Sequence, residues 1–288
     1  NLPTKSVVEY GTTTAYGQTT LEPDRFYYLH LHYLTGLQPT QVYHYRFVAT
    51  DERGGQIVSG DRILTTQALP AAIPVPGNLS GPPYVLNQAN AYYSLSQDID
   101  SNTRGISIKA GGTTLDLNGH TITYDQGTPR VQGAWDSYLY SDSSTAGVHY
   151  WIWAPTPVTR ILNGTIRQGQ NNGQGALGLG FNPILIYSGE VEIAGVTTEY
   201  SGDSVSGIHN NEGTLHAHHN VIVDRGTGIA NRHAGIKGMF CASVGTNGLH
   251  HNLVKRVRQQ GLMTNAGDKI YSNEIYMDSY ATNAFGIR

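Results

Sequence analysis

The sequence predicts an all-β protein in two parts, an antiparallel β-sandwich followed by a coil of short repeated strands. The first observation is composition, because 35 Gly and 19 Tyr with only 14% charged residues suit many short strands joined by tight turns. The second is a set of alternating β-branched and aromatic runs near the N-terminus. The third is one short pattern that recurs along the rest of the chain.

Residues 1–67 carry the alternating runs, which Gly, Pro or Asp interrupt. They read VVEYG from Val7, RFYYLHLHYLTGL from Arg25, QVYHYRFVATD from Gln41 and QIVSGDRILTT from Gln56. Such runs are typical of strands in an antiparallel sandwich.

The stretch LQPTQVYHYRF, residues 37–47, resembles the fibronectin type III signature, in which a Leu and a Pro precede a Tyr that fastens a corner between strands. The resemblance covers residues 6–67 and implies a partial fibronectin type III-like β-sandwich over residues 1–67. The first two strands of that family have no counterpart here. We therefore expect a fragment of a longer chain or a domain that a partner completes, acting as a spacer or adhesive unit.

Residues 68–83 read ALPAAIPVPGNLSGPP and contain five Pro. This composition predicts an extended linker between the two parts.

Residues 84–288 contain the internal repeat. It recurs as TTLDLNGHTITYD, TRILNGTIRQG, VEIAGVTTEYS, LHAHHNVIVDR, LHHNLVKRV and KIYSNEIYMDS. The pattern resembles the right-handed parallel β-helix of pectate lyases and of carbohydrate-binding surface proteins. We expect Asn side chains at equivalent corners to bond along the coil axis. The repeat also runs to the last residues without a cap, so we expect the coil to be incomplete at its C-terminus. The repeats are anchored on Asn118, Asn163, Gly195, Asn220, Asn252 and Asn273.

The β-helix resemblance implies that active residues project from adjacent turns of one parallel face. A polysaccharide lyase needs a base beside a uronate carboxylate and a positive charge that stabilises the enolate. Lys237 or His233 as the base, with Arg256 or Arg232 as the neutralising charge, fits this description. The alternative is a solvated basic rim on the coil.

Other carbohydrate chemistries are disfavoured by absent patterns. Polygalacturonase-like hydrolases share paired Asp, a Gly-His-Gly and an Arg-Ile-Lys, which do not occur in this sequence. Calcium-dependent lyases need converging carboxylates, whereas Asp203, Asp224 and Asp268 are scattered. If the chain is an enzyme, a lyase is therefore favoured over a glycoside hydrolase, and whether it is an enzyme stays open.

Histidines are dense in the later repeats. Because 218–220 and 250–252 both read His-His-Asn at the same place in successive turns, side-chain stacking explains them better than a metal site. We predict no metal and no cofactor. Cys241, the single cysteine, is predicted to be a buried structural thiol.

The aromatic residues of the insertion between the first two repeats are the candidate substrate-binding group. Trp135, Trp151, Trp153 and Tyr150 either stack on sugar rings or close the apolar floor of the insertion.

Charge and hydropathy narrow the partners. A net charge of −3 gives no general attraction to nucleic acid, and no apolar run is long enough for membrane insertion. The sequons at Asn78 and Asn163 are compatible with glycosylation and with an extracellular or cell-surface location.

Two functions remain open. The first is an extracellular carbohydrate-binding or carbohydrate-active protein that acts on an acidic polysaccharide or another glycan. The second is a structural subunit that self-assembles into an oligomer, filament or surface layer through the open sandwich and coil ends. Fold alone does not decide between them.

Overall fold

The computed structural model describes residues 2–68, 70–127, 146–152, 157–169, 182–201, 206–226, 237–241, 246–258, 260–277 and 285–287. Within these ranges the side chains of Lys237, Phe240 and Phe285 are not described, although their backbones belong to strands. The described ranges contain β-strands and no helix. The chain divides into two compact units, Asn1–Ala71 and Ala72–Arg288.

The first unit holds one antiparallel sheet, ordered β2-β1-β3-β4 with β5 also paired to β3. Its central pair, β1 and β3, is in register along the whole length of β1. The strands are β1 (Thr4–Gly11), β2 (Gln18–Thr19), β3 (Val42–Asp51), β4 (Gln56–Val58) and β5 (Arg62–Thr65).

The aromatic run that begins at Arg25 was predicted to be a strand, and it does not form one. Its backbone pairs with the sheet at one isolated bridge, between Tyr27 and Thr4. The ring nitrogens of His30 and His32 instead hydrogen-bond the hydroxyls of Thr4 and Ser6, at 2.8 and 2.7 Å. Side-chain bonds therefore replace a backbone ladder here, and residues 2–68 show one sheet rather than two facing sheets. The fibronectin type III likeness stays a prediction.

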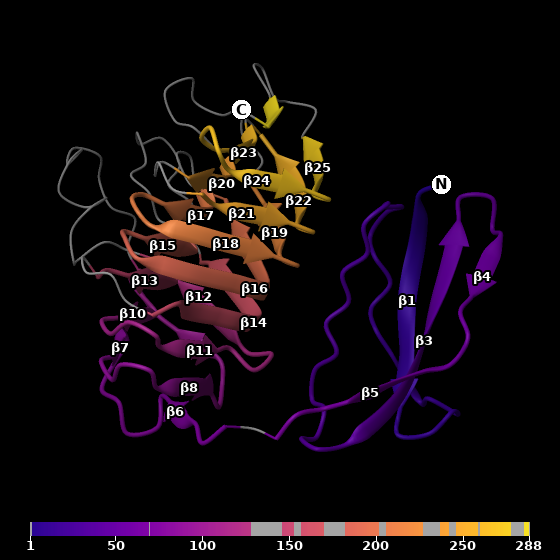
Figure 1. Cartoon of the computed structure of the whole chain (residues 1–288), viewed down its shortest axis with the longest axis horizontal. Coiled ribbons are helices and arrows are strands. Elements are labelled where there is room, and N and C mark those ends of the chain that lie inside the picture. The colour runs from indigo at the N-terminus through magenta and orange to yellow at the C-terminus, as the bar shows by residue number, and fades with distance from the viewer. Residues whose placement is uncertain are drawn as a thin grey trace. The chain divides into compact units, whose positions relative to one another are not determined.

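The second unit is a coil of parallel strands, drawn as stacked layers in Figure 1. Successive turns contribute one strand to an eight-stranded sheet and one or two strands to a thirteen-stranded sheet. All described pairs in both sheets are parallel, as a β-helix requires. The eight-stranded sheet comprises β7 (Tyr84–Leu86), β10 (Ile106–Ile108), β13 (Val148–Tyr150), β15 (Ile184–Ile186), β17 (Ser206–Asn210), β20 (Lys237–Cys241), β23 (Gln260–Met263) and β26 (Phe285–Ile287).

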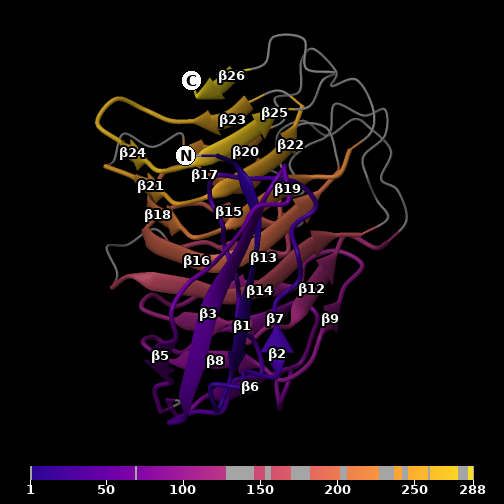
Figure 2. The same cartoon turned by 90° about the vertical axis from the view of Figure 1, so that its right-hand side faces the viewer.

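The thirteen-stranded sheet bends at a corner into two strips. Figure 2 shows β18, β21 and β24 following one another along one side of the coil, and β19, β22 and β25 along another. Two long strands, β14 and β16, run through both strips. The strands are β6 (Ile73–Val75), β8 (Tyr92–Leu95), β9 (Ile99–Asp100), β11 (Thr114–Asp116), β12 (Thr121–Tyr124), β14 (Thr159–Gln168), β16 (Glu190–Tyr200), β18 (Thr214–His218), β19 (Val221–Asp224), β21 (Gly248–His250), β22 (Leu253–Val257), β24 (Lys269–Tyr271) and β25 (Glu274–Met277).

The coil starts inside the segment predicted as a linker. Strand β6 lies within residues 68–83 and pairs in parallel with β8. Val75 has no exposed surface and belongs to the core of the coil. Pro74 is compatible with this position because β6 is the last strand on its edge and needs no further ladder bond.

The core of the coil consists of inward rows of aliphatic residues, one from each turn. On the first strip, for example, Leu115, Ile161 and Ile193 are in register and fully buried. A single turn cannot bury its apolar face alone, so stacking on its neighbours supplies the stability. Cys241 lies in this core, as predicted, and burial raises the pKa of its thiol to about 12.

The corner between the two strips has a recurring backbone conformation. One residue in each of six successive turns adopts a positive φ, between 50° and 67°. Asn and Gly tolerate this left-handed region best, and His is also enriched there. The corner residues are Asn118, Asn163, Gly195, His219, His251 and Ser272.

The sequence anchors of the later repeats were therefore offset by one residue. Asn220, Asn252 and Asn273 follow the corner instead of occupying it. The predicted ladder is confirmed for these three residues. The Asn273 side-chain oxygen accepts from the Asn252 side chain at 2.9 Å, and the Asn252 oxygen accepts from the Asn220 side chain at 3.0 Å.

Candidate functional site

The outer face of the eight-stranded sheet carries two rows of side chains that polar and aromatic residues dominate. Alternate residues of a strand point to opposite faces. Ile106, Val148 and Ile184 are in register and belong to the core. In each of these strands the next residue, and the residue two places after that, therefore face outward. The first outward row contains Ser107, His149, Leu185 and His209, and the second contains Lys109, Trp151 and Tyr187.

Two cations lie beside His149 at this face. Arg104 is only 7% exposed and donates from Nη1 to the Ser107 hydroxyl at 2.7 Å. Burial lowers the pKa of Arg104 to about 10, so it remains charged at neutral pH. Burial, and then the charge of Arg104, lowers the pKa of Lys109. The side chain of Lys109 is half-buried, so its charge is open to solvent.

His149 is the unusual member of the group. Its side chain has no exposed surface, and neither ring nitrogen has a hydrogen-bond partner among the described residues. Burial, followed by the positive charges of Arg104 and Lys109, lowers its pKa to about 3, so the ring is neutral at pH 7. An unmade bond to a buried polar group costs about 1–3 kcal/mol, and such groups in folded proteins call for a specific explanation.

Aromatic rings border this cationic group. The Trp151 and Tyr187 rings stack with their centroids 4.0 Å apart and their planes 26° from parallel. The His149 and Trp151 centroids are 5.6 Å apart. Trp151 and Tyr187 are half-buried and expose part of their rings. We call Arg104, Lys109, His149, Trp151 and Tyr187 the cationic–aromatic cluster.

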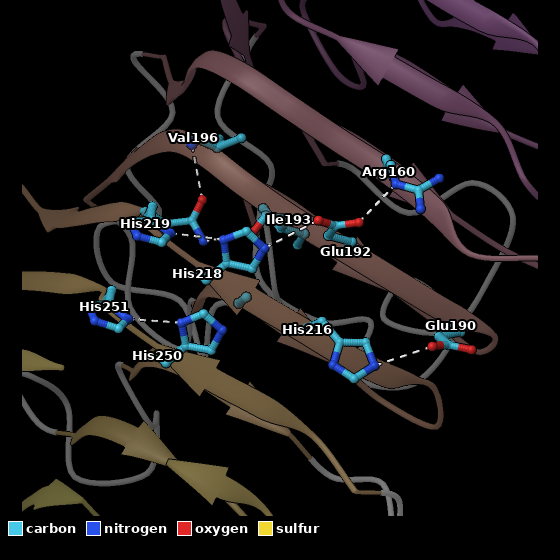
Figure 3. Close-up of polar contacts among 12 residues, drawn as sticks. Arg160, Glu190, Glu192, Ile193, Val196, His216, His218, His219, His250 and His251 are labelled. Atoms are coloured by element: carbon cyan, nitrogen blue, oxygen red, sulfur yellow. Dashed lines mark hydrogen bonds and ion pairs between the residues drawn. The ribbon is translucent and has the colours of Figure 1, made fainter. Parts of the chain in front are cut away.

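A second polar group lies on the outer face of the first strip (Figure 3). The Glu192 carboxylate accepts from Arg160 Nε at 2.8 Å, and its other oxygen lies 3.2 Å from His218 Nε2. In the neighbouring position, His216 Nε2 lies 3.3 Å from a Glu190 oxygen. The predicted stacking of the His-His-Asn repeats is confirmed, because the rings of successive turns lie face to face. Among the described residues no group of three or more His, Cys, Asp or Glu could hold a metal ion.

No family model and no curated protein matches this sequence. A solved structure does match. It is pectate lyase Pel3 from Pectobacterium carotovorum, over 96% of this chain and 85% of that chain, at 10% identity and a TM-score of 0.19. A TM-score this low does not relate the two folds in detail. The description of the coil as a parallel β-helix rests on its own strand register.

Of the four residues predicted for catalysis, the two within the described ranges belong to different sheets. Lys237 lies in β20 of the eight-stranded sheet, opposite Ser206 and Gln260, whereas Arg256 lies in β22 of the thirteen-stranded sheet. Arg256 is exposed, has a φ of 59°, and sits where the register between β22 and β25 shifts. Arg232 and His233 lie outside the described residues.

Arg258, two residues after Arg256, is used for structure. Arg258 is 3% exposed and donates from Nε to Asp224 Oδ2 at 2.8 Å and from Nη2 to Asp224 Oδ1 at 3.0 Å. It also donates to the backbone oxygen of Ser201 at 3.1 Å. This paired geometry binds one turn to the next, so Arg258 serves the inside of the coil.

The residues predicted to bind substrate divide between core, surface and undescribed segments. Tyr150 is fully buried in the core, because β13 turns alternate residues inward, and its ring is not available to a sugar. Trp151, one residue later, belongs to the cationic–aromatic cluster. Trp135 and Trp153 lie outside the described residues.

The two sequons occupy different settings. Asn78 is exposed in the connection between β6 and β7. Asn163 occupies a left-handed corner and donates its side-chain amide to Asp116 at 3.3 Å. Glycosylation of either remains a prediction.

Sequence reasoning missed Arg104, Lys109 and Tyr187. A usable signal exists in the alignment of RGISIKA, AGVHYWI and NPILIYS, residues 104–110, 146–152 and 182–188. These segments form the same strand in successive turns, and aligning them brings Lys109, Trp151 and Tyr187 into one column. The Asn-based anchors lie on the other sheet and did not reveal this column.

Proposed function

We propose that this chain is an extracellular carbohydrate-binding β-helix protein, and that the cationic–aromatic cluster binds an acidic polysaccharide. One observation carries the proposal. The positive charges of Arg104 and Lys109 lie beside a stacked Trp151–Tyr187 pair whose residues are half-buried, with His149 buried against Trp151. These groups match the two parts of a uronate residue, its carboxylate and its sugar ring.

The division of labour follows from the chemistry. Arg104 and Lys109 supply positive charge, and charge-assisted bonds to a carboxylate are stronger than neutral ones. His149, which is neutral and has no exposed surface, lies against Trp151 and supports that ring from below instead of bonding the ligand. The exposed parts of Trp151 and Tyr187 present apolar ring surface to the C–H face of a sugar. The cluster supports binding more directly than lyase chemistry, because an imidazole with a pKa of about 3 is a weak base at neutral pH.

Binding of matched oligosaccharides tests this proposal. We expect calorimetric titration to detect an oligogalacturonate and to detect no binding of a neutral galactose oligomer of equal length. Lys109→Gln removes one cation from the site, and its folding cost is small because burial already disfavours that charge. Losing one charge-assisted bond, worth about 1.5–3 kcal/mol, weakens binding by about tenfold or more.

Lys269→Gln is the matched control, because Lys269 is exposed on β24 of the other sheet. Its affinity for the acidic oligomer should equal that of the wild type. Equal binding of the acidic and neutral oligomers, or equal losses in the two lysine variants, would remove the basis of the proposal.

We also propose that the coil winds in a right-handed sense and that the N-terminal unit is a fibronectin type III-like spacer. Parallel crossover connections are right-handed in nearly all known cases. The spacer is supported by Tyr43, which is 5% exposed and whose hydroxyl accepts the Gln38 backbone N–H at 2.9 Å. A tyrosine that bonds a backbone group a few residues upstream is the corner device of that sandwich class.

A further inference from the structure

Four histidines of two successive turns form two adjacent columns of stacked rings on the outer edge of the coil (Figure 3). The rings of His218 and His250 are parallel within 2°, with centroids 5.0 Å apart. The rings of His219 and His251 are parallel within 4°, with centroids 5.1 Å apart. Tyr271 continues the first column, 4.8 Å from His250. We call His218, His219, His250 and His251 the imidazole stack.

Within each turn the two imidazoles are held edge to edge. His218 Nδ1 and His219 Nδ1 are 3.0 Å apart, and His250 Nδ1 and His251 Nδ1 are also 3.0 Å apart. A hydrogen bond between two ring nitrogens needs one N–H and one lone pair. Each pair therefore keeps its bond while neutral or singly protonated. A second proton puts two N–H groups opposite each other and breaks it.

Glu192 sets the proton arrangement of the first pair. Its carboxylate is 3.2 Å from His218 Nε2, which places a proton on that nitrogen. In neutral His218 the other nitrogen, Nδ1, is then the acceptor, and His219 donates. This contact is destroyed only when His218 Nδ1 and His219 Nδ1 both carry a proton.

The charges around the stack are unequally distributed. Arg160 and His218 both contact Glu192, so this carboxylate is shared between the stack and a permanent cation. His216 is paired with Glu190 on the same face. On β24, Lys269 precedes Tyr271 along the outward positions.

The imidazoles of the stack also influence one another's protonation. Burial, then the neighbouring imidazoles, lowers the pKa of both His219 and His250. Protonation is thus opposed by the stack itself.

We propose that the imidazole stack is an acid-sensitive clasp, which holds the turns around β18, β21 and β24 together when neutral and loosens them when it is protonated. Two of these rings stand on the corner itself, because His219 and His251 have φ of 55° and 52°. Doubly protonated pairs lose the edge contact, and charged rings in parallel columns repel one another.

The direction of the pH effect follows from proton binding. His219 and His250 have lower pKa values in the fold than the unfolded value of about 6.5. The unfolded chain therefore binds more protons than the fold in the window below about pH 6.5, and the free energy of unfolding falls as the pH falls. The stabilisation is fully present above the unfolded pKa. The lowered pKa of His149 also makes the free energy of unfolding fall in acid. The contribution of the clasp is therefore measured by comparing variants that all retain His149.

Hydrogen exchange at pH 7.5 and pH 5.0, corrected for intrinsic rates, tests the clasp in the full chain. The variant is His219→Asn with His251→Asn, because Asn163 already occupies the same corner in an earlier turn. The control is His120→Asn, since His120 pairs with Asp98 on another turn and lies outside the stack.

We expect the amides of β18, β21 and β24 in the wild type and in the control to lose protection from exchange in acid. Each pKa unit by which folding lowers an imidazole pKa corresponds to about a tenfold loss. The double variant should lose less. Equal loss in all three proteins overturns the proposal.

Titration of the wild-type imidazoles by NMR provides a second measurement that does not depend on the variant folding. The clasp requires that the two histidines of each pair titrate in separate steps, with the later step well below about pH 6.5. Four independent titrations near that value contradict it. The result is separate from glycan binding, which uses other residues on the other sheet.

Discussion

Asn252 holds the centre of the asparagine ladder, and its replacement tests how the coil is held together. Its side chain donates to the backbone oxygen of Ala217 at 2.8 Å and to Asn273 at 2.9 Å. Its oxygen accepts from the backbone N–H of Asn220 at 3.1 Å and from the Asn220 side chain at 3.0 Å. One side chain therefore links three successive turns.

The substitution Asn252→Ala leaves two backbone groups without partners, the Asn220 N–H and the Ala217 carbonyl, in residues with no exposed surface. An orphaned buried group costs about 1–3 kcal/mol. The free energy of unfolding of the coil should thus fall by about 2–6 kcal/mol. Asn273→Ala removes similar bonds at a half-buried position, where water replaces them, and should cost less than half as much.

Urea unfolding followed by tryptophan fluorescence provides the assay. Trp135, Trp151 and Trp153 all belong to the second unit, so the signal reports on the coil and not on the N-terminal sheet. The midpoint should move while the slope stays constant. Equal losses for the Asn252 and Asn273 variants would refute the reasoning, because burial is what distinguishes them.

Two further predictions concern proton uptake and the first unit. A carboxylate bound nearby should raise the pKa of His149 above its value of about 3 in the ligand-free protein. Affinity for an acidic oligosaccharide should therefore rise from pH 7 to pH 5, with uptake of a proton on binding. Calorimetry in buffers of different ionisation enthalpy measures this proton uptake, and His149→Gln should abolish it. Tyr43→Phe removes the acceptor of the Gln38 N–H and should destabilise the first unit by about 1–3 kcal/mol. The coil's tryptophan-detected midpoint should not change, and a shift there would contradict the assignment.

The fold was predictable where local pattern and tertiary structure agree. Inward rows of Ile, Leu and Val and the bonded Asn220, Asn252 and Asn273 follow from a repeat visible in the sequence. The prediction was wrong where a different residue type adopts the same left-handed corner conformation. His219 takes a left-handed corner that Asn163 takes elsewhere, so aligning Asn with Asn shifted the later repeats by one residue.

The candidate site was less predictable, because it depends on lateral register between turns separated by long insertions. Arg104 and His149 are remote in sequence, and only the pairing of β10 with β13 brings them together. Tyr150 and Trp151 are adjacent in sequence, yet strand alternation buries one in the core and leaves the other half-exposed. Self-assembly and extracellular location stay predictions, as no contact within this chain tests them. Among the described residues no helix has the length and hydropathy to span a membrane.

The two long strands β14 and β16 have a consequence for how disturbances travel along the coil. They are in register at eight positions, from Thr159 opposite Val191 to Arg167 opposite Glu199, whereas the next turn pairs with β16 through two separate strands, β18 at five positions and β19 at four. If a coil behaves as a row of coupled units, opening spreads easily through weak couplings and stops at a strong one. Arg104 and Lys109 precede this pair in the chain, and the imidazole stack follows it. Because β14 and β16 each run through both strips, we expect the two strips of these turns to open together, whereas β18 and β19 are separate strands and can open one at a time.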